Sequence, residues 1–386
     1  MSKRNIVILG STGSIGRSTI EVLEAHADCF NVCALAAHSN VELLVSQAKK
    51  LHPEYVCVVD ESKASLLTEQ LSDQSVTVLA GEEELVRLAS LSEAEMIVNA
   101  VVGAAGLRAS LAAVEKGKAL ALANKESLVA GGPLFPALME KSGGTILPID
   151  SEHSAIWQAL ACGRKEEVRK IIITASGGPF REYPLEQFDD ITKDQALNHP
   201  TWKMGPKITI DSATLANKGL EVIEAVALFQ VPVEQIEVVI HPQSIVHSMV
   251  EFVDSSILAQ LSTPDMRLPI TNALFWPERV ESDFGRLDMS NLNRLTFEPP
   301  DLNRFEALKI AFEVAAVGGT APAVFNAANE VAVAAFLDGR IKFGQIGRVI
   351  AEAVDKLTIV SGPTLSDILE ADSLARKEAA HLAGLK

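Results

Sequence analysis

Residues 6–16 read Ile6-Val7-Ile8-Leu9-Gly10-Ser11-Thr12-Gly13-Ser14-Ile15-Gly16, an apolar run followed directly by three glycines at three-residue spacing. The apolar run is typical of a buried strand, and the glycines allow a tight turn into a following helix. The N-terminal amides of such a helix attract anions, so we expect this turn to bind the pyrophosphate of a dinucleotide. The alternative is a glycine turn with a purely structural role.

Strand-like runs recur through the first 150 residues and alternate with helical stretches. The runs cover residues 6–9, 32–36, 55–59, 96–102, 119–123 and 145–149. This alternation predicts an α/β fold in which residues 1–149 form a Rossmann-like, doubly wound parallel sheet. Polar groups follow several of these runs, and ligands bind at the carboxyl ends of strands in such sheets.

The rest of the chain is predicted to hold a catalytic domain, a linker and a small helical domain. Residues 150–275 contain widely spaced apolar runs at 171–173, 208–210, 238–240 and 245–250, which favour an α+β catalytic domain. Segment 177–206 is long and contains glycine, proline and aromatic residues, so we expect a flexible lid. Residues 276–302 read as a linker, and 303–386 as a small C-terminal helical domain. We hypothesise that this last domain supports the lid and the outer wall of the site.

The composition limits the possible classes of protein. The chain has 386 residues, is 48% hydrophobic and carries a formal net charge of −16. It can therefore bury two or three domain cores, while its negative field disfavours nucleic acid and anionic membranes as partners. No apolar run reaches about 18 residues, so we expect no membrane span. The four cysteines lack zinc-like spacing and are expected to be buried, reduced thiols, which indicates a cytoplasmic location.

Three carboxylates in two polar segments are candidate metal ligands. If Asp150 and Glu152 continue the strand before them, their side chains point the same way. Glu221 can join them from a helix on which Asn217 lies one turn earlier. Hard oxygen ligands without thiolates suit Mg²⁺ or Mn²⁺. The alternative is that these acids cap a strand end and decorate a helix surface.

A second set of polar side chains is predicted to hold a phosphate group. Its members are Ser176, Ser212, Asn217 and Lys218. Ser212 follows the strand expected at 208–210, and Gly219 weakens the next helix without benefit unless something approaches it closely. From the lid, His199 is the candidate donor, while Trp202 and Met204 are expected to exclude water or, alternatively, simply to pack the loop.

The end of the second strand bears on cofactor choice. It holds His38, Ser39 and Asn40 where NAD-binding proteins usually place an acidic residue, which favours NADP. No arginine or lysine stands there to pair with a 2′-phosphate, although His38 and Ser39 can donate hydrogen bonds to it.

Seven segments resemble those of the 1-deoxy-D-xylulose-5-phosphate reductoisomerase family, the NADPH-dependent enzymes of the non-mevalonate isoprenoid pathway. They are GSTGSIG (10–16), LANKES (122–127), PIDSEHS (148–154), TASGGPF (174–180), HPTWKMG (199–205), DSATLANKGLE (211–221) and NAANE (326–330). One departure concerns the cofactor. The family commonly has a glycine and a basic residue before Asn40, where this chain has His38 and Ser39.

The resemblance implies a full set of site residues. Metal ligands would be Asp150, Glu152 and Glu221, which together with Lys125 are the expected catalytic residues. Substrate contacts would be Lys125, Ser151, Glu152, Ser176, His199, Trp202, Ser212, Asn217, Lys218 and Glu221. Cofactor contacts would be Gly10, Thr12, Gly13, Ser14, Ile15, His38, Ser39, Asn40, Asn124, Glu126, Gly205 and Met266.

The resemblance also implies the reaction and the assembly. Metal-bound 1-deoxy-D-xylulose 5-phosphate would rearrange to an aldehyde, which NADPH reduces to 2-C-methyl-D-erythritol 4-phosphate. A homodimer is implied, with residues 245–253 as a candidate contact. Two alternatives remain at this point: an ordinary NADP-dependent dehydrogenase, which needs no metal site, and a redox-sensing protein that binds the dinucleotide only as a signal.

Overall fold

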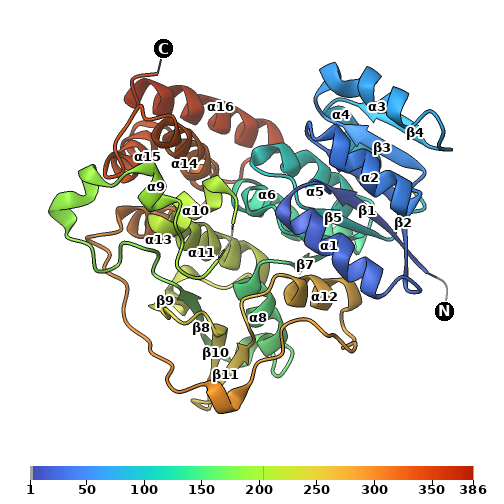
Figure 1. Cartoon of the computed structure of the whole chain (residues 1–386). Coiled ribbons are helices and arrows are strands. Elements are labelled where there is room, and N and C mark those ends of the chain that lie inside the picture. The colour runs from blue at the N-terminus through green and yellow to red at the C-terminus, as the bar shows by residue number, and fades with distance from the viewer. Residues whose placement is uncertain (1–2, 203, 386) are drawn as a thin grey trace. The chain divides into compact units, whose positions relative to one another are not determined.

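The computed structural model describes residues 3–202 and 204–385 (Figure 1). Its contacts divide the chain into two compact units, each assembled from three segments. The first contains Met1–Ser127, Phe135–Ser154 and Met266–Phe284, and the second contains Leu128–Leu134, Ala155–Asp265 and Gly285–Lys386. The domain limits expected at residues 149, 275 and 302 stay predictions. Lys203 of the predicted lid lies outside the described residues.

The first unit contains a seven-stranded parallel sheet with strand order β4-β3-β2-β1-β5-β6-β7. The strands are β1 (Arg4–Leu9), β2 (Phe30–Ala37), β3 (Tyr55–Val58), β4 (Thr77–Ala80), β5 (Met96–Asn99), β6 (Ala119–Leu122) and β7 (Thr145–Pro148). This confirms the doubly wound sheet. Strand β4 was not predicted, because this edge strand is short, is at most partly buried and has an apolar run of only three residues.

Helices connect these strands. They are α1 (Ser14–Ala25), α2 (Val41–Leu51), η1 (Glu61–Lys63), α3 (Ala64–Gln70), α4 (Glu83–Ala89), η2 (Ala104–Gly106), α5 (Leu107–Glu115) and α7 (Phe135–Ser142). Helix α12 (Arg267–Phe275) comes from later in the chain and also belongs to this unit. Helix α6 (Lys125–Gly131) begins in this unit and ends in the second. Strands β2 to β4 are added on one side of β1, and β5 to β7 on the other side. The carboxyl ends of β1 and β5 therefore form the crevice where such sheets bind ligands.

Gly10 makes the turn after β1 possible. Its φ angle is +85°, and a Cβ at this position would lie 2.5 Å from the carbonyl oxygen of Ala100, just beyond β5. Any other residue would therefore strain the backbone and push the two strand ends apart. The turn leads into α1, whose N-cap residue Gly13 makes no side-chain capping bond, so the first amides of the helix can face an anion.

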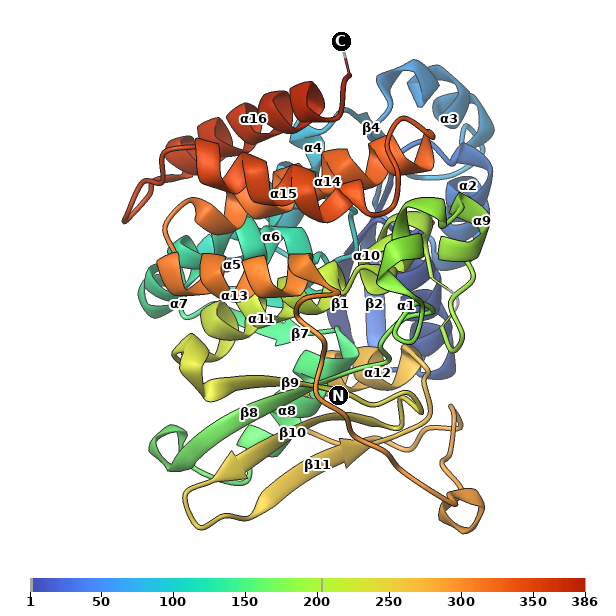
Figure 2. The same cartoon turned by 90° about the vertical axis from the view of Figure 1, so that its left-hand side faces the viewer.

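The second unit contains a four-stranded mixed sheet with strand order β11-β10-β8-β9 (Figure 2). The strands are β8 (Val168–Ala175), β9 (Ile236–Ile240), β10 (Val246–Phe252) and β11 (Ile257–Leu261). Strands β8 and β9 are parallel, and the other pairs are antiparallel. The sequence analysis did not identify β11, whose Ile257, Leu258 and Ala259 are exposed.

The strand expected at residues 208–210 is wrong, because these residues lie in helix α10 (Pro206–Ala213). A segment of three residues, Ile208-Thr209-Ile210, is too short to distinguish a strand from a helical turn by periodicity. Pro206 stands at the start of the helix, where its fixed φ angle suits the first turn and its missing N–H costs nothing. Lys207 and Asp211 then form an ion pair four residues apart on the helix, with 2.9 Å between Nζ and Oδ2.

The other helices of the second unit include the predicted C-terminal set. They are η3 (Gly132–Leu134), α8 (Ser151–Leu160), which begins in the first unit, η4 (Lys165–Glu167), η5 (Leu185–Asp190), α9 (Lys193–Ala196), α11 (Ala216–Phe229), η6 (Val233–Gln235), η7 (Met289–Asn291), α13 (Glu306–Val317), α14 (Ala321–Leu337), α15 (Gln345–Lys356) and α16 (Leu365–Leu382). The C-terminal helices do not stand alone: α13 packs on α11, and α14 packs on α10, α11 and α16.

Gly219 explains the tight packing of α11 on α13. A Cβ at Gly219 would lie 2.6 Å from the Cβ of Ala311 on α13, closer than two carbon atoms can approach. The sequence indicated that another group lies close to Gly219. That group is Ala311 of a C-terminal helix.

Two further expectations concern the whole chain. Within the described residues, none of the helices combines the length and apolar character that a membrane crossing requires. All four cysteines are free thiols, but only Cys33 and Cys57 are buried, whereas Cys29 and Cys162 are exposed. The expectation of four buried thiols is therefore wrong for two of them. Cys29 lies in a turn and Cys162 follows α8, where the chain meets solvent.

Candidate active site

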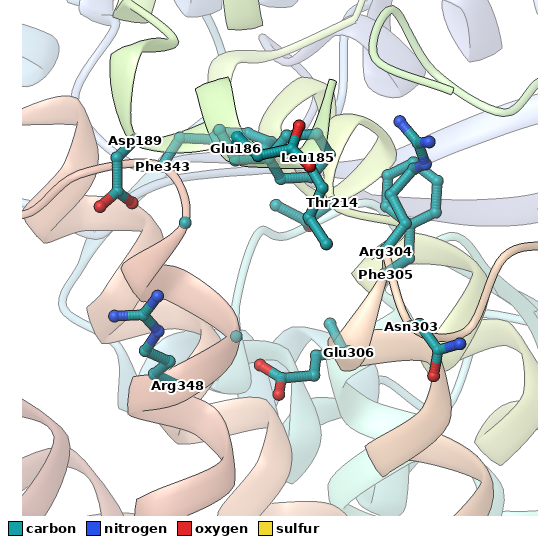
Figure 3. A pocket seen from close by; sticks show the side chains of 14 residues that line it. Leu185, Glu186, Asp189, Thr214, Asn303, Arg304, Phe305, Glu306, Phe343 and Arg348 are labelled. Atoms are coloured by element: carbon teal, nitrogen blue, oxygen red, sulfur yellow. The ribbon is translucent and has the colours of Figure 1, made fainter. Parts of the chain in front are cut away.

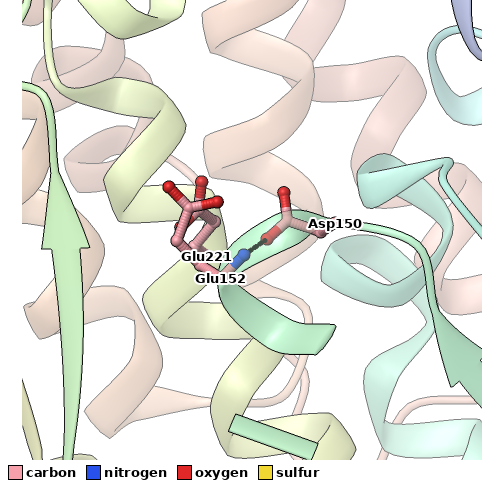
Figure 4. A group of neighbouring side chains, drawn as sticks. All are labelled: Asp150, Glu152 and Glu221. Atoms are coloured by element: carbon pink, nitrogen blue, oxygen red, sulfur yellow. Dashed lines mark hydrogen bonds between the residues drawn. The ribbon is translucent and has the colours of Figure 1, made fainter. Parts of the chain in front are cut away.

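The candidate metal centre consists of three carboxylates. One oxygen from each of Asp150, Glu152 and Glu221 lies within 4.8 Å of the other two (Figure 4). Asp150 and Glu152 are partly buried, and Glu221 is fully buried. The donor set contains only hard, anionic oxygens, which is what Mg²⁺ and Mn²⁺ prefer. These residues therefore fit a divalent cation.

The sequence predicted that Asp150 and Glu152 continue the strand before them, but they do not. Strand β7 ends at Pro148 and α8 begins at Ser151. The Oδ1 atom of Asp150 accepts hydrogen bonds from the backbone N–H groups of Glu152, at 3.1 Å, and His153, at 3.2 Å. Asp150 thus caps the first turn of α8, where a carboxylate is favoured by the unpaired amides. Asp150 and Glu152 thus lie at the start of a helix. The directions of their side chains follow from the helix start and not from the alternation of side chains along a strand.

Neighbouring side chains hold the two acids at the start of α8. The ammonium group of Lys125, at the first position of α6, forms an ion pair with Oδ2 of Asp150. The buried ring of His153 places Nδ1 3.5 Å from Oδ1 of Asp150. The hydroxyl of Ser151 donates to Oε2 of Glu152 at 2.7 Å. No role was predicted for His153, although its spacing of three residues from Asp150 is a usable signal in the sequence.

Helix α11 supplies Glu221 together with two of the predicted phosphate contacts. The amide nitrogen of Asn217 donates to Oε1 of Glu221 at 2.6 Å, and the ammonium group of Lys218 pairs with Oε2 of Glu221. Lys218 and Glu221 are both buried. The side-chain oxygen Oδ1 of Asn217 is buried and accepts no hydrogen bond within the described residues. A buried acceptor without a partner is costly, which marks this position as one prepared for another group.

The turn between α10 and α11 is strained. Leu215 has a φ angle of +56° and is buried. The left-handed region costs a residue with a side chain about 1–2 kcal/mol. Such strain is concentrated at functional sites, and here it ends one helix at Ala213 and starts the next at Ala216. As a result Ser212 and Asn217 come from two successive helices.

Ser176, His199 and Ser212 converge in the second unit. Ser176 follows β8, His199 lies in the predicted lid, and Ser212 lies on α10. The Nε2 atom of His199 is 3.1 Å from the hydroxyl oxygen of Ser176 and 3.1 Å from that of Ser212. The structure thus brings together three predicted substrate contacts from separate parts of the sequence.

Backbone hydrogen bonds define the state of the His199 ring. Its Nδ1 atom accepts from the N–H groups of Thr201, at 3.1 Å, and Trp202, at 2.9 Å. An Nδ1 atom that accepts cannot carry a proton, so the proton of the neutral ring lies on Nε2. Burial also lowers the pKa of His199. His199 is therefore a neutral donor whose Nε2–H group faces the two serine hydroxyls.

Trp202 packs on a second histidine. Its ring meets the His247 ring edge to face, with 6.3 Å between centroids. His247 is buried on β10, and its Nε2 atom lies 2.9 Å from the hydroxyl of Ser262. The sequence analysis left His241 and His247 as core or supporting residues, and both are buried. Met204 is partly buried.

The predicted cofactor contacts of the first unit lie around the carboxyl ends of β1, β2, β5 and β6. Asn40 caps α2, with Oδ1 accepting from the N–H group of Leu43 at 3.1 Å. The side-chain nitrogen of Asn124 lies 2.8 Å from the carbonyl oxygens of both Val101 and Gly103, and 2.9 Å from Oε2 of Glu126. Asn124 therefore ties the loop after β5 to the start of α6.

The remaining predicted cofactor contacts are solvent-facing or lie at helix starts. Thr12, Gly13, Ser14 and Ile15 form the turn and the first residues of α1. His38 and Ser39 are exposed after β2. Gly205 is the N-cap residue of α10, and Met266 is the N-cap residue of α12.

The first half of the predicted lid packs on Phe343, in the loop between α14 and α15. Phe188 of η5 is buried, with its ring centroid 5.7 Å from that of Phe343. Phe180 lies 5.1 Å from the same ring. A pocket of about 340 Å³ opens beside these contacts, lined by η5 and by the N-terminal ends of α13 and α15 (Figure 3). The hypothesis that C-terminal helices support the lid is consistent with these contacts.

Comparison with known proteins places the chain in a family. Its sequence matches the models for 1-deoxy-D-xylulose 5-phosphate reductoisomerase over residues 6–132, for the C-terminal domain of that enzyme over 146–229, and for the DXP reductoisomerase C-terminal domain over 261–378. The chain belongs to the 1-deoxy-D-xylulose 5-phosphate reductoisomerase family.

Relatives of known name are similar over their full length. The 1-deoxy-D-xylulose 5-phosphate reductoisomerase of Chlorobaculum tepidum is 50% identical, covering 99% of this chain and 100% of that protein. The enzyme of Halothermothrix orenii is 49% identical and covers 99% of each.

Solved reductoisomerase structures have the same fold. The enzyme of Zymomonas mobilis in complex with NADPH is 46% identical, with a TM-score of 0.93 and 99% of each chain covered. A reductoisomerase in complex with NADPH, fosmidomycin and magnesium is 41% identical, with a TM-score of 0.95, covering 99% of this chain and 98% of that one. The fold expected from the sequence is thereby confirmed for the whole chain.

Proposed function

We propose that this chain converts 1-deoxy-D-xylulose 5-phosphate to 2-C-methyl-D-erythritol 4-phosphate, with NADPH as reductant and Mg²⁺ or Mn²⁺ as metal. The observation that carries the proposal is that the carboxylates of Asp150, Glu152 and Glu221 lie close together, in a chain whose full length matches the family. An ordinary dehydrogenase needs the nucleotide turn but has no use for these three acids.

The residues around the carboxylates have distinct proposed roles. When bound, the cation acts as a Lewis acid on the substrate ketone and the neighbouring hydroxyl, and NADPH supplies the hydride. Asp150, Glu152 and Glu221 would hold the cation, and Glu152 would also accept a proton from the substrate. Lys125, which Asp150 holds in place, adds positive charge where negative charge develops on substrate oxygens.

The phosphate group is proposed to bind to the second unit. Ser176 and Ser212 offer hydroxyls, Lys218 offers an ammonium group, and His199 offers its Nε2–H group. Asn217 would contact the same substrate. Because the phosphate does not react, its binding energy can hold the lid closed, with Trp202 excluding water from the reaction.

NADPH is proposed to bind at the carboxyl end of the sheet in the first unit. Its pyrophosphate would meet the amides at the start of α1, and Asn40, Asn124 and Glu126 would frame the site together with Gly205 and Met266. His38 and Ser39 are the candidates for contacts with the 2′-phosphate. Neither carries a permanent positive charge, so we expect weaker discrimination against NADH than an arginine would give.

We further propose a homodimer that forms through the edge of the four-stranded sheet. Strand β10 is paired on both sides, whereas β11 is an edge strand with exposed Ile257 and Leu258. An apolar edge strand is normally covered, and a second copy can continue the sheet across a two-fold axis. We also propose a cytoplasmic location, because free thiols are typical of a reducing compartment.

The decisive experiment follows NADPH absorbance with purified protein and 1-deoxy-D-xylulose 5-phosphate. Oxidation that requires Mg²⁺ or Mn²⁺ and disappears with a chelator is the expected result. A parallel assay with NADH measures how far His38 and Ser39 select the cofactor. If NADPH binds but no metal ion restores its oxidation, the reductoisomerase assignment is overturned and the plain dehydrogenase becomes the better interpretation.

A further inference from the structure

Helix α14 contains two buried asparagines that look alike and have different partners. Asn326 and Asn329 are both fully buried, and the side-chain oxygen of each accepts no hydrogen bond within the described residues. The amide nitrogen of Asn326 donates to Oε1 of Glu330 on the same helix, at 2.9 Å. The amide nitrogen of Asn329 donates to Oδ1 of Asp211 on α10, also at 2.9 Å.

The unpaired oxygen shows that Asn329 is an expensive choice for packing alone. A leucine of similar size would fill the same space without burying an amide oxygen that lacks a partner. What leucine cannot do is donate to a buried carboxylate. The bond to Asp211 is therefore the feature that an amide at this position provides.

Asp211 lies next to the proposed phosphate contacts. It is buried on α10, directly before Ser212, whose hydroxyl faces His199. One carboxylate oxygen pairs with Lys207, one turn earlier on the same helix. That pair does not connect α10 to another element, whereas the bond from Asn329 does.

Helix α10 needs such a connection because it is short. It has eight residues, begins at Pro206, the last residue of the predicted lid, and ends before the strained Leu215. Helix α14 is firmly held in turn: Glu330 pairs with Arg376 of α16, at 2.8 Å, and Arg376 also pairs with Asp372. The hydrogen bond from Asn329 thus connects α10, which carries Ser212, to the C-terminal helices.

We propose that Asn329 is a positioning residue for substrate phosphate: by holding Asp211, it fixes α10 so that Ser212 faces the phosphate. This inference rests on the proposed function. It also gives the C-terminal helices a role in substrate affinity beyond completing the core.

The test compares Asn329→Leu with the matched control Asn326→Leu. We expect Asn329→Leu to raise the KM for 1-deoxy-D-xylulose 5-phosphate about tenfold, the loss typical of one hydrogen bond to a charged group. The affinity for NADPH, measured by tryptophan fluorescence, should not change. Asn326→Leu should leave both constants near the wild-type values. If Asn329→Leu does not fold, Asn329→Ala removes the same amide without adding volume.

The outcomes separate the inference from the proposed function. Equal substrate KM values for the Asn329 variant and the wild-type enzyme, or equal increases in both variants, would show that Asn329 serves stability only. A wild-type protein without metal-dependent oxidation of NADPH would instead remove the proposed function itself.

Discussion

His199 illustrates how a single side chain is prepared before any ligand arrives. Two backbone N–H groups occupy its Nδ1 atom, and burial lowers its pKa. Its Nε2–H group can therefore donate to a phosphate without being charged. A protonated ring would bind a dianion more strongly, but the backbone amides would then face an N–H group in place of an acceptor.

We predict that His199 keeps the neutral Nε2–H form in the free protein and gains a proton only below pH 6.5, the ordinary value for histidine. Since the unfolded chain gains this proton first, the associated stability is complete above about pH 6.5 and is lost as the pH falls through the lowered pKa. Nitrogen NMR of histidine-labelled protein measures the tautomer and the titration, with His199→Gln to assign the signal. A titration midpoint at or above 6.5 would contradict this prediction.

Glu221 is predicted to be essential for metal affinity. Glu221→Gln removes one of three anionic ligands and should weaken Mn²⁺ binding about tenfold or more, since even residues that only orient a ligand contribute this much. Electron paramagnetic resonance of free Mn²⁺ measures this without any turnover. Glu166→Gln, at an exposed position in η4, makes the same change of charge and should bind Mn²⁺ like the wild type. Unchanged Mn²⁺ affinity in the Glu221 variant would remove this residue from the metal site.

At the scale of elements, the junction of α11 with α13 places Glu221, Lys218 and Asn217. The junction is close because Gly219 has no side chain where Ala311 approaches. Helix propensity alone would favour alanine at position 219. The sequence therefore gives up local helix stability for close packing of the helix that carries the proposed metal ligand Glu221.

Gly219→Ala is predicted to destabilise the protein despite its better helix propensity. Overpacking costs about 1–3 kcal/mol, more than the roughly 1 kcal/mol that alanine gains over glycine in a helix. A lower thermal midpoint in calorimetry is the expected result. The double variant Gly219→Ala with Ala311→Gly makes room on α13 and should recover part of the loss, because directly contacting sites are coupled. If the stability change of the double variant equals the sum of the two single changes, the contact between residues 219 and 311 does not limit the packing of α11 on α13.

At the scale of the whole molecule, the exposed edge of β11 bears on assembly. Replacing both Ile257 and Leu258 by lysine is predicted to convert the proposed dimer to a monomer, because charges block pairing of an edge strand. Sedimentation velocity gives the mass directly. Leu66→Lys on α3 alters a residue of comparable exposure and should leave the dimer intact. A wild-type protein that sediments as a monomer would refute the edge-strand dimer.

Much of the fold followed from sequence periodicity. Six of the seven parallel strands were visible as apolar runs, because strands buried on both faces contain few polar residues. The edge strands β4 and β11 were not, since each has an apolar run of only three residues and none of its residues is fully buried. The run at 208–210 was assigned to a strand because three residues do not reveal a period.

The sequence by itself determined the nucleotide turn, the parallel sheet, the helical C-terminus and the family, because each is recorded in local spacing or in long matching segments. The identities of the three proposed metal ligands were also visible in the sequence. Only the tertiary structure decided that His199 bridges two serines and that Asn329 holds Asp211. These contacts join residues through a loop and a packing interface. Their geometry depends on how separate elements meet, which no local pattern in the chain encodes.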